Sequence, residues 1–131
     1  SIVMAVSALE VLNLTSHIAE ELDPAVFVPA VGQGAVAVEC RNDSSDVLEA
    51  LAGINDETTA TEVTIERAYL GELGAGCTAP LGAHVSGGVL TAFLGGDASN
   101  FRLSIELIGD FKRDIAAARA LANEARVAVG V

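Results

Sequence analysis

The pattern of apolar and polar positions divides the chain into two parts of different character. In the second part it predicts a helix over residues 56–73, strands over 81–85, 89–94 and 102–108, and a helix over 114–129. Gly74 follows the first helix, and Gly87-Gly88 marks a hairpin turn between the first two strands. This order predicts an α+β unit over residues 56–131, with a three-stranded antiparallel sheet and helices on one face.

Residues 1–55 show a weaker pattern and no obvious core of their own. The sequence predicts an apolar helix over 2–14, short strands over 26–28 and 35–40, and a helix over about 45–52. Exposed apolar strands favour association with other chains. We therefore expect this chain to be prone to self-association.

Composition and charge narrow the classes of function. Apolar residues make up 51% and charged residues 19% of the 131 positions, which is typical of a folded protein. No apolar stretch approaches the roughly 18 residues of a membrane span, and no signal peptide is indicated. A net charge of −11 argues against nucleic acid or an anionic membrane as partner. Two cysteines do not make a disulfide framework, so we expect a cytoplasmic protein.

Cys77 is the main candidate for chemistry. It lies in the small-residue segment 73–84, where neighbouring glycines such as Gly76 allow close approach by another group. The residues alone allow a nucleophile, a metal ligand, a covalent anchor or an ordinary loop position. A metal site is not expected, because no CxxC is present and His17 and His84 lack further ligands at suitable spacing. The preceding helix C-terminus opposes thiolate formation, which favours attachment over thiolate catalysis.

Gln33 and Gly34 form a second candidate site, in a glycine-rich segment that leads into the predicted strand 35–40. The Gln33 amide offers both a donor and an acceptor beside backbone that can approach closely. A phosphate loop is not indicated, because these glycines precede a strand instead of a helix. A structural crossover between domains is the alternative interpretation.

Arg67 and Cys40 complete the candidates. Arg67 is expected on the apolar face of its helix, where a guanidinium needs a partner. That partner is either a carboxylate in a neighbouring segment or an acidic ligand near Cys77. Cys40 ends an apolar strand and is expected to be an inert buried thiol.

Three of these segments resemble motifs of one enzyme family, the porphobilinogen deaminases or hydroxymethylbilane synthases. The segments are Pro-Ala-Val-Gly-Gln-Gly-Ala-Val-Ala-Val-Glu-Cys-Arg at 29–41, Glu-Arg-Ala-Tyr-Leu at 66–70, and Leu-Gly-Ala-Gly-Cys-Thr-Ala-Pro-Leu-Gly-Ala at 73–83. They occur in the family's order. The resemblance extends over nearly the whole chain but covers only a C-terminal portion of the family's usual length.

The resemblance implies an enzyme that joins four porphobilinogen molecules into hydroxymethylbilane, with loss of ammonia, in tetrapyrrole (haem) biosynthesis. Cys77 aligns with the cysteine that carries the family's dipyrromethane cofactor through a thioether. Gln33, Gly34 and Gly76 would border that cofactor, and Arg67 would brace the third domain. The family's catalytic residues and substrate-binding arginines lie in segments outside this chain. We therefore expect no catalytic residue here and no turnover by this chain alone.

The resemblance also implies a division into domains. Residues 1–29 correspond to the end of a second α/β domain, 30–55 to a segment returning to the first domain, and 56–131 to the third, cofactor-attachment domain. The full-length enzyme is implied to be a monomer.

Two other classes of function remain open. A small-molecule-binding or regulatory α+β module predicts reversible ligand binding and no modification at Cys77. A structural interaction domain predicts self-association through the apolar N-terminal helix, with Cys77 dispensable.

Overall fold

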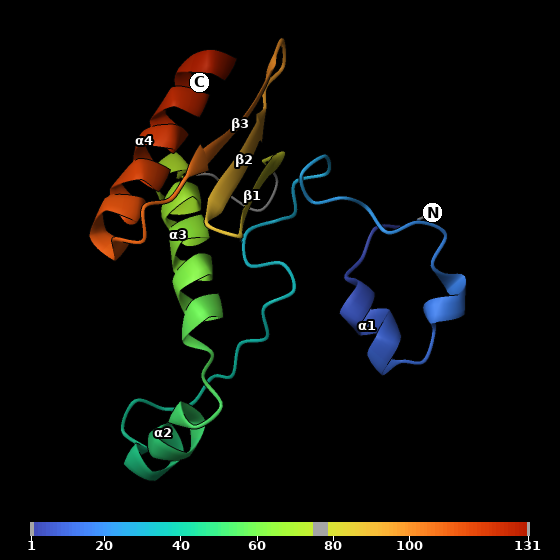
Figure 1. Ribbon diagram of the computed structural model, residues 1–131, viewed down its shortest axis with the longest axis vertical. Coiled ribbons are helices and arrows are strands. Elements are labelled where there is room, and N and C mark those ends of the chain that lie inside the picture. The colour runs from blue at the N-terminus through green and yellow to red at the C-terminus, as the bar shows by residue number, and fades with distance from the viewer. Residues whose placement is uncertain (1, 75–78, 131) are drawn as a thin grey trace.

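A computed structural model describes residues 2–74 and 79–130. Its elements are α1 (Val6–Val11), the 3-10 helix η1 (Thr15–His17), α2 (Ser45–Ala52), α3 (Glu57–Leu73), β1 (Leu81–Ser86), β2 (Val89–Gly95), β3 (Asn100–Glu106) and α4 (Phe111–Val129). The strands form one antiparallel sheet in the order β1-β2-β3. Figure 1 shows α3 and α4 side by side on one face of this sheet, which confirms the predicted α+β fold.

Aspartates start the two long helices, and glycines end them. The Asp56 carboxylate accepts a hydrogen bond from the Thr59 N–H (2.7 Å), and Asp110 caps α4 in the same way. These contacts satisfy amides of the first turn that have no partner within the helix. Gly74 ends α3 with a φ of 61°, in the left-handed region that glycine adopts without strain.

Helix α4 begins at Phe111, three residues before the predicted start at 114. Asp114 does not cap the helix, because its carboxylate accepts hydrogen bonds from the Ile108 and Gly109 N–H groups (2.9 and 3.1 Å). It thereby holds the turn that enters the helix. No helix among the described residues, α4 included, is long and apolar enough to cross a membrane.

The hydrophobic core lies between the sheet and the two long helices. Ala83 and Ala92 are paired across β1 and β2, and both are fully buried in this core. Tyr69 and Leu90 are fully buried within this core. Of the described residues before α3, only Val31 packs against the cluster.

The first part of the chain differs from its predicted structure, although α2 is confirmed. The apolar helix spans only α1, and residues 26–28 and 35–40 form no strand. A strand needs a hydrogen-bonded neighbour, and the described residues offer none to these segments. Val36 and Val38 are 92% and 60% exposed. Figure 1 shows α1 and η1 set apart from the sheet.

Candidate functional site

The structure brings residues 30–34, here called the glycine loop, against the edge of the sheet beside α3. The loop turns tightly, because the Gln33 N–H donates to the Ala30 oxygen (2.9 Å) and the Ala35 N–H donates to the Gly32 oxygen (3.1 Å). Gly34 follows with a φ of 89°. Gln33 and Gly34 are both exposed. The polar amide of Gln33 is therefore available to a ligand.

Cys77 and Gly76 lie outside the described residues, in the connection between α3 and β1. On the α3 side, Gly74 is exposed and has open space where a side chain would be. On the β1 side, the Pro80 oxygen accepts a hydrogen bond from the Gly95 N–H (2.7 Å). Leu73, the last residue of α3, packs against the hydrophobic core. Both ends of the connection are thus attached to the unit formed by α3, α4 and the three-stranded sheet, here called the core unit.

The edge of the sheet is occupied where the glycine loop meets it. Because β1 is an edge strand, alternate N–H groups point away from β2 and need other partners. The Ala83 N–H donates to the Pro29 oxygen (3.1 Å), and the Val85 N–H donates to Glu66 Oε1 (2.8 Å). A preceding chain segment and a helix side chain therefore take the place of a neighbouring strand.

Glu66 is the site residue that the sequence analysis missed. It is buried in the core unit, with the residue only 4% exposed. Oε2 accepts a hydrogen bond from the Gly32 N–H (2.7 Å), and His84 Nδ1 lies 3.5 Å from Oε1. A buried carboxylate is tolerated when hydrogen bonds satisfy it. Glu66 lies three residues before Tyr69 and seven before Leu73, so the three side chains share one stripe of α3. This spacing was the signal in the sequence that could have placed Glu66 on the buried face.

Arg67 does not lie on the buried face of α3, so that prediction is wrong. Its side chain is exposed and forms no ion pair with another described residue. The buried face contains Ile65, Glu66 and Tyr69 instead, because α3 packs against both α4 and β1. Cys40 also differs from its prediction, since it is half-buried and lies outside any strand.

Gly82 makes room for the chain that enters the glycine loop. A Cβ atom at this position of β1 would lie 2.6 Å from the Val28 oxygen and 2.7 Å from the Pro29 oxygen. Real Cβ atoms do not approach backbone oxygens so closely. Gly82 therefore allows residues 28–29 to lie directly on the strand.

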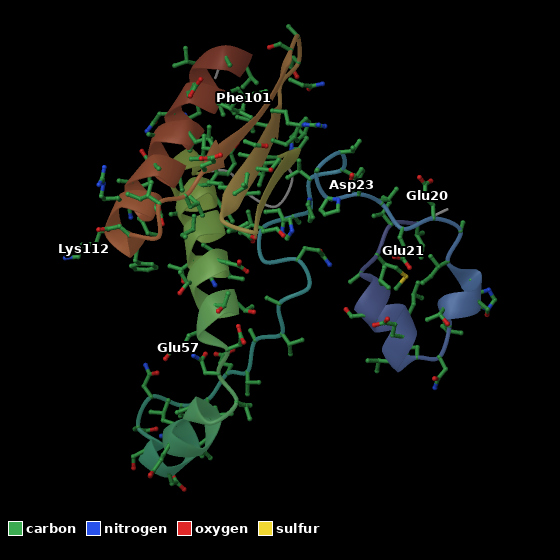
Figure 2. All side chains as sticks on the ribbon, in the orientation of Figure 1. Glu20, Glu21, Asp23, Glu57, Phe101 and Lys112 are labelled. Carbon is green, nitrogen blue, oxygen red and sulfur yellow. The ribbon has the colours of Figure 1, made fainter. Side chains whose placement is uncertain are left out.

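A hollow of about 390 Å³ lies between residues 23–25 and the outer face of the sheet. His84, Thr91 and Ser104 contribute to its lining, and the Thr91 and Ser104 hydroxyls are 2.9 Å apart. Figure 2 shows Asp23 where the chain reaches the sheet. Among the described residues, no group of three or more His, Cys, Asp or Glu side chains could hold a metal ion.

Comparison with known proteins identifies the family that these segments resemble. A family model described as "Porphobilinogen deaminase, dipyromethane cofactor binding domain" matches residues 1–49. A porphobilinogen deaminase of Roseiflexus sp. (strain RS-1) is 43% identical over 89 residues, which are 66% of this chain and 29% of that protein. That of Nocardia farcinica is 47% identical over 83 residues, 63% of this chain and 24% of that protein.

A third relative, the porphobilinogen deaminase of Halalkalibacterium halodurans, is 44% identical over 87 residues, or 66% of this chain and 28% of that protein. The resemblance to the porphobilinogen deaminase family is therefore confirmed. The chain spans less than a third of the length of these curated relatives. Cys77 lies outside the residues that the family model matches.

Proposed function

We propose that this chain is part of a porphobilinogen deaminase, the transferase that joins four porphobilinogen molecules into hydroxymethylbilane. Each addition breaks one carbon–nitrogen bond and releases ammonia, and water releases the finished product from its primer. The observation that carries the proposal is the 43–47% identity to porphobilinogen deaminases over about two thirds of the chain. The contact between the glycine loop and Glu66, which joins two of the family-like segments, supports it further.

Cys77 is the proposed attachment point of dipyrromethane, through a thioether at its sulfur. When bound, this group supplies a primer that stays on the protein while the product grows. The open space at Gly74 and the attachment of both flanks to the core support this role. A tethered primer makes each coupling effectively intramolecular, provided that its anchor is held near one site.

The remaining machinery is proposed to lie in other segments of the enzyme. Porphobilinogen has two carboxylate side chains, an acetate and a propionate, whereas this chain has 7 basic and 18 acidic residues. Carboxylate recognition favours arginine pairs. We infer that those cations and the catalytic acid–base group are supplied elsewhere, and that this chain alone does not turn over porphobilinogen.

We assign residues 1–29 to the second domain of the enzyme, 30–55 to its first domain and 56–131 to its third. The full-length enzyme is proposed to be a cytoplasmic monomer. The hydrophobic core supports this assignment, because all of its described residues lie in α3 or later in the chain, and Val31 alone packs against it from an earlier segment. The exposure of Val36 and Val38 supports self-association of the isolated chain.

Intact-mass measurement tests the anchor in the full-length enzyme that contains this sequence. We expect the unmodified sequence and Cys40→Ser to carry an added mass equal to dipyrromethane, and Cys77→Ser to carry none. Cys40→Ser is the matched control, because it removes the chain's other thiol. An added mass that persists in Cys77→Ser would refute the anchor. Absence of any addition, with reversible ligand binding, would favour the small-molecule-binding module.

A further inference from the structure

We propose that Glu66 is a positioning residue, whose carboxylate fixes the glycine loop to the core unit and thereby sets the place of Gln33. The contacts themselves do not depend on the proposed function. The effect of these contacts on turnover does rest on the proposed function, because Gln33 and Cys77 belong to the same proposed site.

The two oxygens of Glu66 bind main-chain donors from two separate segments. Oε2 accepts from Gly32, 34 residues earlier in the chain, and Oε1 accepts from Val85, 19 residues later. A carboxylate is the side chain suited to this, because both of its oxygens accept and neither donates. Hydrogen bonds to a charged acceptor are stronger than neutral ones, and burial strengthens them further. Glu66 thus joins α3, β1 and the glycine loop at one point.

The loop has few other attachments to the core unit. The Pro29 oxygen accepts from the Ala83 N–H before the loop, and the Val31 side chain packs against the core. Between residues 35 and 55, the described residues form no hydrogen bond with another part of the chain beyond local turns and α2. Gly32 is therefore the last held residue before Gln33. Loss of its bond to Glu66 would leave the turn that carries Gln33 without a fixed position.

A purely structural role for Glu66 predicts a different outcome from a positioning role. If Glu66 only stabilised the fold, its replacement would weaken all of the core unit together. If it positions the loop, the Gly32 amide should lose protection while the centre of the sheet keeps it. Amide hydrogen exchange separates these cases, since local openings and global unfolding expose different amides.

The test is hydrogen exchange by NMR on the 131-residue chain and its Glu66→Gln variant. Glutamine keeps one acceptor and places an NH₂ donor where the second oxygen was. We expect the Gly32 amide to exchange about tenfold faster or more, with Ala92 in β2 unchanged. Glu124→Gln is the control, because it removes the same charge from an exposed position on α4. Unchanged exchange at Gly32, or equal acceleration at Ala92, would overturn the proposal.

A second measurement uses the full-length enzyme. There, Glu66→Gln should lower kcat by about tenfold with the Cys77 adduct still present by intact mass, because a misplaced group slows the reaction without removing the primer. An unchanged kcat would overturn the positioning role in turnover. Absence of porphobilinogen turnover in the unmodified enzyme would refute the proposed function instead. The exchange result at Gly32 would then still decide whether Glu66 fixes the glycine loop.

Discussion

Tyr69 is a single residue whose environment produces a measurable titration. Its side chain is fully buried, and its hydroxyl donates to the Phe93 oxygen (3.2 Å). Burial disfavours the phenolate and raises the pKa of Tyr69 to about 12. The folded state thus keeps a proton that the unfolded state loses near pH 10. The stability that Tyr69 contributes is complete below about pH 10 and is lost as the pH rises through 12.

Ultraviolet absorbance of the ionised phenol measures this directly, because Tyr69 is the only tyrosine and the chain has no tryptophan. We expect a midpoint clearly above 10 in the folded protein and a return to about 10 in denaturant. Tyr69→Phe should cost about 1 kcal/mol at neutral pH, since the Phe93 oxygen loses its donor. It should also reduce the loss of stability above pH 10. A folded-state midpoint at 10 would contradict the raised pKa.

At the scale of elements, the contact between residues 28–29 and β1 depends on Gly82. Gly82→Ala would place a Cβ atom against two backbone oxygens, which cannot move away as a flexible side chain can. We expect a loss of about 1–3 kcal/mol in the free energy of unfolding, measured by urea denaturation. Gly71→Ala is the control, because this exposed position on α3 has open space and alanine favours a helix. Equal stability of the two variants would show that the segment yields without cost.

The elements from α3 onward could be predicted because each one finds its partners within the same stretch of chain. The first cap of α3, the glycine turns and the alternation in β1 and β2 agree with the packed structure. The starts of β3 and α4 were predicted two and three residues too late. The strands expected over 26–28 and 35–40 could not be predicted correctly, since an apolar run does not show whether a neighbouring strand exists.

In the candidate site, the sequence likewise could not predict which residues of α3 are buried. Averaging apolar positions around the helical wheel placed Arg67 inside and overlooked Glu66. The structure buries Glu66 because two main-chain donors, at Gly32 and Val85, come from segments remote in sequence. Helical periodicity carries no information about such donors. Gln33 and Gly34 are placed in an exposed turn, whereas the role of Cys77 stays a prediction.

At the scale of the whole molecule, the stable part is the core unit together with the short segment that closes its edge. None of the described residues before 23 is buried, and α1 and η1 contribute no side chain to the core. Residues 29–32, in contrast, supply the Pro29 oxygen, the Val31 side chain and the Gly32 amide to that unit. A truncation that keeps residues 29–32 should therefore leave the stability of the core unit nearly unchanged, whereas one that removes them should lower it.

Two truncations measured by thermal unfolding test this dependence. Removal of residues 1–22 should leave Tm within about 2 °C, because no buried surface is lost. Removal of residues 1–34 should lower Tm by roughly 5–15 °C, because about 1–3 kcal/mol of edge hydrogen bonding and packing disappears from a small unit. Glu66→Gln in the longer truncation should then have little further effect, since its Gly32 donor is already absent. Equal Tm values for the two truncations would mean that the glycine loop contributes nothing to the stability of the sheet edge.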